Sequence, residues 1–148
     1  MTSPTIARDT LIDALRTSWL ASATTVNIEL QFDNVRDDTP TGQDSEGRPL
    51  PFGRITMRHV GGDQETLGNV GARRFGSGGT VTVQIFTAPG DGHALSDVIA
   101  AEVRAAMQAL RSPNGVWLNE ISPPIEIGRT GTWFQVNVAA SFSYEEVA

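Results

Sequence analysis

Residue types that commonly carry catalysis or bind metals are scarce in this chain of 148 residues. It contains no cysteine, which excludes a disulfide scaffold, a thiolate metal site, an iron–sulfur site and a cysteine nucleophile. Its two histidines are His59, expected on a strand face beside apolar residues, and His93, expected at the surface in the first turn of a helix. A histidine placed like His59 is more often packed or hydrogen-bonded than a metal ligand, and the spacing of the two matches no zinc motif. We therefore expect no metal site.

Other catalytic patterns are equally weak. No Gly-x-Ser-x-Gly elbow precedes a helix, although sequence order alone leaves a Ser–His–Asp triad open. Residues 76–80 (GSGGT) resemble a phosphate-binding loop only in their glycines; because they lack the lysine and lead into a strand, we interpret them as a flexible hairpin turn. The carboxylate pairs Asp9/Asp13 and Asp37/Asp38 would need an apolar pocket to serve acid–base chemistry, and we interpret both as solvated. The sequence predicts no cofactor and no enzymatic activity.

Charge gives a second set of constraints. The chain has 17 acidic residues and 11 basic ones, all of them arginine, for a formal net charge of −6. This balance argues against tight nucleic-acid binding, which needs clustered positive charge. The absence of lysine fits either a codon bias or a preference for arginine at interfaces. Arg73 and Arg74 form a basic doublet that could join Arg58 and Arg54 on one sheet edge, either in ion pairs with the acidic loops or in contact with a partner.

The elements that would position these residues begin with two amphipathic helices. The first is predicted over residues 4–20, with Ser3 as N-cap. The second is predicted from Asp91 or Gly92 to about Leu110. Their apolar stripes contain Leu11, Leu15 and Trp19 in the first helix, and Leu95, Val98, Ile99, Val103, Ala106, Met107 and Leu110 in the second.

Period-two alternation and turn residues predict the strands. Turns are expected at 76–79 and 128–131, and a connecting loop at 61–69. Because helices do not alternate with strands, we predict an α+β fold, a mostly antiparallel sheet with two helices packed on one face. The predicted strands are 26–32, 55–60, 70–75, 81–87, 116–121, 125–127 and 133–144. The length favours a single domain over 1–148.

Two features stand out from this pattern. Residues 34–53 form a long polar loop without large apolar residues in its acidic part, and it is either a disordered insertion or a segment that orders on a partner. The polar face of the last strand, 133–144, is uncharged until Glu145 and leaves room for another surface to approach. No apolar run reaches the roughly 18–20 residues of a membrane helix, and residues 1–8 lack the apolar segment of a secretory signal.

The whole arrangement resembles the phage tail terminator family, also called tail completion proteins, and in particular the group that includes the lambda-type minor tail protein U. The resemblance covers nearly the full chain: the order of elements, the segments 71–76 (GARRFG) and 80–86 (TVTVQIF), the PGDG turn at 89–92 before a helix, and the closing strand 133–144. The departures are the long acidic loop and the break at Pro123-Pro124.

The resemblance implies a structural role in siphovirus-like virions, which assemble in the bacterial cytoplasm. Such proteins form a hexameric ring on the head-proximal end of a long tail tube, stop its polymerisation and present a surface to the head connector at the neck. DNA passes through the lumen without specific binding. Six copies would carry a formal charge of −36, and an acidic lumen would repel the DNA phosphates. No membrane is involved.

The interface candidates are arginines that would meet a neighbouring subunit's acids and loop acids that would contact the tail tube or connector or line the lumen. They are Arg58, Arg73, Arg74, Asp37, Asp38, Asp44 and Glu46. Two alternatives stay open. One is another neck or tail component, such as a head–tail joining protein or a tail tube subunit. The other is a small hydrolase or ligand-binding domain, which would need a histidine beside a carboxylate in a pocket.

Overall fold

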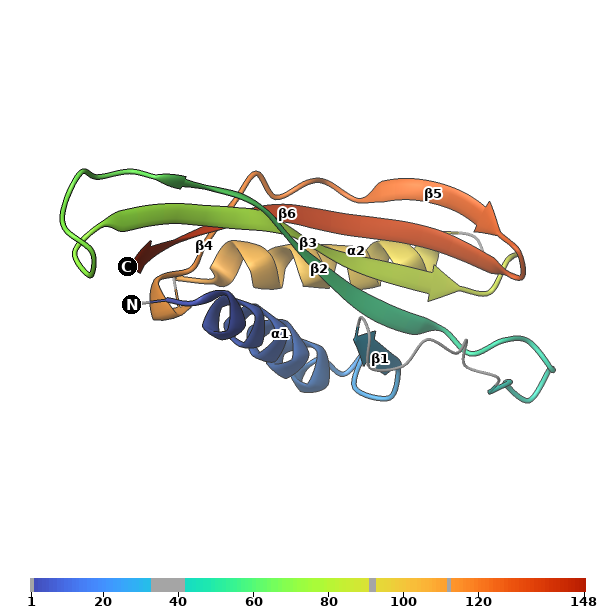
Figure 1. The fold of residues 1–148 in the computed structure, drawn as a ribbon. Helices are drawn as coiled ribbons and strands as arrows, with labels where there is room; N and C mark the ends of the chain where they lie inside the picture. Colours follow the sequence, from blue (N-terminus) through green and yellow to red (C-terminus); the bar gives the residue numbers. More distant parts are fainter. Residues whose placement is uncertain (1, 33–41, 91–92, 112) are drawn as a thin grey trace.

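A six-stranded sheet with two helices on one face makes up the structure (Figure 1). The computed structural model describes residues 2–32, 42–90, 93–111 and 113–148. The elements are α1 (Pro4–Ala21), β1 (Glu29–Phe32), β2 (Phe52–Gln64), β3 (Arg74–Thr87), α2 (Ala94–Ala109), a 3₁₀ turn (Pro113–Gly115), β4 (Trp117–Asn119), β5 (Ile125–Thr130) and β6 (Trp133–Val147). This arrangement confirms the predicted α+β fold.

The strands follow the order β1-β2-β3-β6, and both β4 and β5 pair with the far edge of β6. All of these pairs are antiparallel except β1 with β2, which is parallel. A parallel pair needs a crossover connection, and the long segment between β1 and β2 provides the length for one.

The first helix forms as predicted. The Ser3 hydroxyl accepts a hydrogen bond from the Ile6 amide at 3.2 Å and caps the helix, whose first residue is a proline. Its buried side chains are Ala7, Leu11, Leu15 and Trp19, which pack on the sheet.

The second helix begins later than predicted. It starts at Ala94, and His93 occupies the N-cap position without a side-chain hydrogen bond. The apolar stripe is also narrower than predicted: Leu95 and Val98 remain 37% and 47% exposed, because the helix rests on the sheet along a row centred on Ile99, Val103 and Met107. The two exposed residues belong to the first turns, on the flank of that row.

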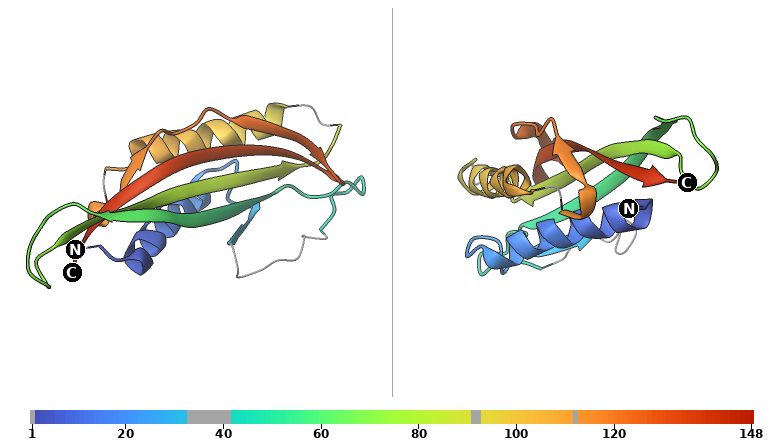
Figure 2. Two further views of the ribbon diagram at one scale, coloured as in Figure 1. Left: turned by 45° about the horizontal axis from the view of Figure 1, so that its top comes forward. Right: turned by 90° about the vertical axis from the view of Figure 1, so that its left-hand side faces the viewer.

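The core lies between the sheet and the two helices. Alternate residues of the central strands fill it: Val81, Val83 and Ile85 of β3 and Val136, Val138 and Ala140 of β6 are almost completely buried. This alternation confirms the predicted period of two for the central strands. The opposite face of the sheet carries no helix, as Figure 2 shows.

Several strand boundaries differ from the predictions. β1 begins at Glu29, because residues 23–27 form a turn that leaves Val26 exposed. Residues 61–64 belong to β2 and were not predicted as strand. Residues 70–73 were predicted as strand but lie in the connection before β3. β5 extends to Thr130, so the turn that precedes β6 lies at 131–132.

The largest difference concerns the glycine run 76–79, which is strand and not a turn. Gly76 pairs with Asp63 of β2, and Gly78 pairs with Ser143 of β6. Strands on both sides supply the backbone hydrogen bonds, and this overrides the local turn preference of glycine.

The long pairing creates an arm, which we define as residues 60–79, the outer part of the β2–β3 hairpin. It projects beyond the helices at one end of the sheet (Figures 1 and 2). The end of β6 supports the arm along one side, and backbone hydrogen bonds join Arg73 and Ala148 in both directions at 2.9 and 3.1 Å.

Candidate functional site

The helix-free face of the sheet is a broad surface of small, uncharged side chains. We define it by the outward residues of the three long strands: Thr56, Thr80, Thr82, Gln84, Asn137, Ala139, Ser141 and Ser143. They lie in cross-strand rows, for example Thr56 beside Thr82 and Thr82 beside Ala139. The prediction that β6 has an uncharged polar face is thereby confirmed and extends to β3. Such a face lets another protein approach the sheet closely.

Two arginines of β2 frame this face and differ in their contacts. Arg54 donates to Gln31 Oε1 at 3.1 Å, and its guanidinium lies 5.8 and 5.7 Å from the ring centroids of Phe52 and Phe86. Arg58 lies in the row of Thr80, is exposed, and has no ion pair within the described part of the chain. Arg58 therefore leaves an exposed positive charge on this face.

An aromatic cluster that sequence reasoning missed closes one end of the sheet. Phe52 and Phe86 are register partners and stack with centroids 4.5 Å apart, and Trp133 meets Phe52 edge-on at 5.0 Å. All three are buried. Because their contact depends on strand register, no local signal in the sequence marks it.

A groove of about 390 Å³, which we call the arm groove, opens at the other end of the sheet. Its lining includes Gly76 and Gly78, which contribute no side chains, and two exposed apolar residues, Val60 at 68% and Trp117 at 59% exposure. Three carboxylates also line it: Asp63, Glu65 and Glu145. These glycines stand out in the sequence, but they predict a hairpin turn. The groove is therefore not predicted from the sequence.

His59 packs among aromatic rings. Its ring meets Phe142 and Tyr144 edge-on, with centroids 5.4 and 5.9 Å away. Burial lowers the pKa of His59, the nearby Arg8 lowers it further, and Glu146 acts in the opposite direction. Burial likewise raises the pKa of Tyr144. The interpretation of His59 as a packed residue agrees with this position.

His93 lies elsewhere, at the start of α2. Its Nδ1 is 3.8 Å from Glu126 Oε1, and both side chains are more than half exposed. Its ring contacts Phe134 at 5.1 Å. It lines neither the arm groove nor the apolar void of about 20 Å³ between the helices and the sheet, which has room for little more than a water molecule.

The basic doublet and Arg58 do not form a single cluster. Arg73 places its guanidinium 5.5 Å from the Phe75 ring centroid, and Arg74 Nη1 lies 3.6 Å from Glu145 Oε2. Both lie at the outer end of the arm, whereas Arg58 pairs with Thr80 well inside the sheet. Arg74 thus forms an ion pair within the chain, with Glu145 of β6.

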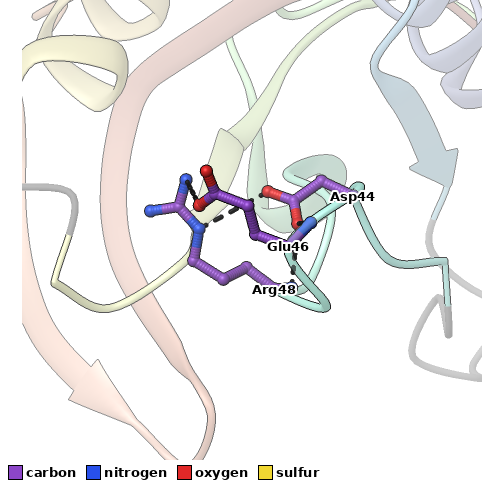
Figure 3. A network of polar contacts seen from close by, with 3 residues as sticks. All are labelled: Asp44, Glu46 and Arg48. Carbon is purple, nitrogen blue, oxygen red and sulfur yellow. Dashed lines mark hydrogen bonds and ion pairs between the residues drawn. The ribbon is translucent and has the colours of Figure 1, made fainter.

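Part of the acidic loop forms an ordered turn. Asp44 Oδ1 accepts hydrogen bonds from the backbone amides of Glu46 and Arg48, both at 2.9 Å (Figure 3). The Arg48 guanidinium lies 3.5 Å from Asp44 Oδ2 and 3.1 Å from Glu46 Oε2. The Arg48 amide is the main cause of the lowered pKa of Asp44. Asp37 and Asp38 lie outside the described residues.

This turn places a compact acidic feature at the surface beside β2. Gly47 adopts a φ of 78°, a conformation that glycine accepts readily, and its amide donates to the Asp44 carbonyl at 3.1 Å. Arg48 is not among the predicted site residues. Its position four residues after Asp44 could have indicated the ion pair between them.

The described residues contain no group of three or more histidine, aspartate or glutamate side chains placed to hold a metal ion. Within the same residues, no helix has the length and apolar character needed to cross a membrane.

Comparison with known proteins shows the fold alone. No protein-family model and no curated protein sequence matches this chain. Among solved structures, 22 chains match. One of them superimposes with a TM-score of 0.64 at 14% sequence identity, over 100% of this chain and 99% of its own length. The fold described here is therefore shared over its whole extent by a protein of very different sequence.

Proposed function

We propose that this protein is a phage tail terminator, which caps the head-proximal end of a long tail tube, ends tube polymerisation and forms part of the interface with the head. The observation that carries the proposal is the helix-free face, a wide sheet surface with small uncharged side chains and one available cation, Arg58. Such a surface suits close protein–protein contact. The order of elements, which resembles that family, supports the same assignment.

Assembly fits the distribution of polar groups better than catalysis does. His59 is packed against aromatic rings, and His93 forms an exposed pair with Glu126. Neither histidine is among the residues that line the arm groove. A hydrolase would bring a histidine and a carboxylate together in a concave site.

The charge of the chain fits a conduit for DNA. A ring of six copies would carry a formal charge of −36. Repulsion between acidic side chains and phosphates would let DNA pass through the lumen without non-specific binding. The turn around Asp44 and Glu46 holds two such acids in a fixed arrangement. In the proposed assembly this turn lines the lumen or contacts the tube or the connector.

The proposal is tested by tail assembly with and without the protein. With it, tail tubes should end at a uniform length and join heads; without it, they should be longer, variable in length and headless. Normal tails in its absence would contradict the proposal. Long filaments formed by the pure protein would instead indicate a tail tube subunit.

Arg58→Glu is the matched variant for the helix-free face. Reversing the charge there should impair termination while the protein stays folded, because an exposed side chain adds little to stability. Arg111→Glu, another exposed arginine, is the control and should terminate tails normally. The double variant Arg73→Glu, Arg74→Glu tests the doublet, and tails of normal length would remove both residues from the interface.

A further inference from the structure

The arm, whose residues form much of the lining of the arm groove, and the β5–β6 hairpin lie at opposite ends of the elongated sheet (Figure 1). We propose that the arm groove of one copy receives the β5–β6 hairpin of the next copy, so that copies of this chain join head to tail. The proposal rests on the proposed ring-forming function and assigns the surfaces that make the ring.

The groove has the shape and charge to hold a narrow cationic segment. The groove lies along Gly76 and Gly78, between the exposed side chains of Val60 and Trp117, and the Glu65 side chain lies directly beside Gly76. Of its three carboxylates, Glu145 pairs with Arg74, and among the described residues no second arginine pairs with the other two, so the groove keeps an excess of negative charge. Asp63 is exposed and has no ion pair in the part of the chain that the structure describes.

The β5–β6 hairpin is complementary to this groove. Arg129, just before its tip, is exposed and has no ion pair among the described residues. Gly131, in the turn, has a positive φ of 59°, and Gly128, at a register irregularity of β5, has a φ of 91°; both are conformations that glycine adopts readily. Ile127, beside Arg129, is 50% exposed. The hairpin thus presents one aliphatic and one cationic side chain on a narrow edge.

The chemistry of the two surfaces matches group by group. The Arg129 guanidinium can pair with the free carboxylate of Asp63 and stack on the Trp117 indole, since arginine does both at interfaces. The side chains of Ile127 and Val60, both exposed in the single chain, can be buried against each other. Glu126, the acid of β5, is already turned to His93 and need not oppose the groove.

The occupant is a second copy because one molecule cannot bring its own two ends together. Unlike surfaces at opposite ends make a heterologous interface, which continues from copy to copy until the rotation closes a ring.

Cross-linking tests the contact directly. Because the native chain contains no cysteine, only the introduced thiols can react. Val60→Cys places a thiol on the groove, and Thr132→Cys places one on the exposed hairpin turn. The two single variants are mixed, alone and on isolated tail tubes, and treated with a short bis-maleimide. We expect a cross-linked dimer from the mixture, and a ladder of oligomers from the double variant.

The matched control replaces the groove cysteine by Leu20→Cys, which is also exposed but lies on α1. Mixed with Thr132→Cys, it should give no specific cross-link. Failure of the Val60→Cys and Thr132→Cys mixture to cross-link, both alone and on tail tubes, would overturn the proposal.

A charge exchange tests the ion pair. Asp63→Arg and Arg129→Asp should each raise the protein concentration needed for assembly by about tenfold or more, as expected for like charges in contact. The double variant restores one acid and one arginine at every contact and should assemble like the native protein. Arg111→Asp is the control. Unchanged assembly in both single variants, or no rescue in a folded double variant, would overturn the proposal.

These results separate this inference from the proposed function. If all these variants still end tails normally, the proposed function stands and the proposed contact is wrong. A native protein that neither ends tails nor forms a ring contradicts the proposed function itself.

Discussion

Single glycines shape the arm by allowing strands to approach closely. A Cβ on Gly79 would overlap the carbonyl oxygen of Arg58 in β2, and one on Gly78 would lie 2.5 Å from the carbonyl oxygen of Phe142 in β6. Gly78 and Gly79 are glycine because the backbones of β6 and β2 leave no space for their side chains. From the sequence alone these residues predict a turn, since glycine clusters usually mark turns and the crowding comes from distant strands.

We predict that Gly79→Ala destabilises the protein by on the order of 2 kcal/mol, because the added methyl group forces the strands apart. Gly68→Ala is the control: its nearest atoms would lie 3.7 Å away, in ordinary contact. Urea denaturation of both variants measures the difference. An equal loss of unfolding free energy in the two variants would contradict the prediction, because it would show that β2 and β3 accommodate the added methyl group.

His59 makes stability depend on pH. Because burial lowers its pKa in the folded protein, the unfolded chain binds more protons on this residue once the pH falls below about 6.5, and the folded state loses stability in that window. We predict that His59→Phe keeps the ring contact with Phe142 and removes this loss. Melting temperatures from about pH 7.5 to about pH 5.5 test this, and parallel curves for variant and native protein would contradict it.

At the scale of elements, hydrogen bonds of Trp19 connect the C-terminal end of α1 to the segment that follows it. Its Nε1 donates to the Ile28 carbonyl at 2.9 Å, and the Thr25 hydroxyl donates back to the Trp19 carbonyl at 2.6 Å. Just after the helix, Ser22 donates to Glu102 of α2 at 2.6 Å. These contacts direct the chain through the turn into β1.

We predict that Trp19→Phe costs about 1–2 kcal/mol, because the Ile28 carbonyl loses its donor in a partly buried site. Trp117→Phe makes the same chemical change on an exposed tryptophan and should stay within about 0.5 kcal/mol of the native protein. Chemical denaturation measures both. A similar loss of unfolding free energy in both variants would show that the hydrogen bond from Trp19 to the Ile28 carbonyl does not contribute the predicted stability.

Elements with strong periodicity were predictable and those set by remote contacts were not. The stripe of α1 and the alternation in β3 and β6 follow from the repeats of a helix and a strand. The parallel pairing of β1 depends on a long crossover, and the strand character of 61–64 depends on pairing with β3. Neither leaves a local pattern in the sequence.

The same holds for the candidate site. The uncharged face of β6 was predicted from alternation, but its continuation through Thr82 and Thr56 depends on register. The arm groove combines residues from β2, β3, β4 and β6, so it exists only in the assembled sheet. The basic doublet is visible in the sequence, but its distance from Arg58 follows from the length of the arm.

At the scale of the whole molecule, the proposed head-to-tail contact predicts the size of the proposed ring. The 15 residues of β6 span about 50 Å, so six copies placed end to end would give a mean ring diameter of roughly 90 Å. Electron micrographs of isolated caps measure this diameter. A ring well below this size would mean that the copies stand side by side, contrary to the proposed contact.

The central pairing of β3 with β6 also governs how the chain folds. β2 with β3 and β5 with β6 are neighbours in sequence and can form early as separate hairpins. The join between them pairs Arg74 with Val147 and Thr87 with Phe134, across a stretch that contains α2, β4 and β5. Closing so long a loop costs chain entropy before any contact rewards it. We therefore expect the meeting of the two hairpins to be the slow step of folding, with an open edge exposed on each hairpin until it occurs.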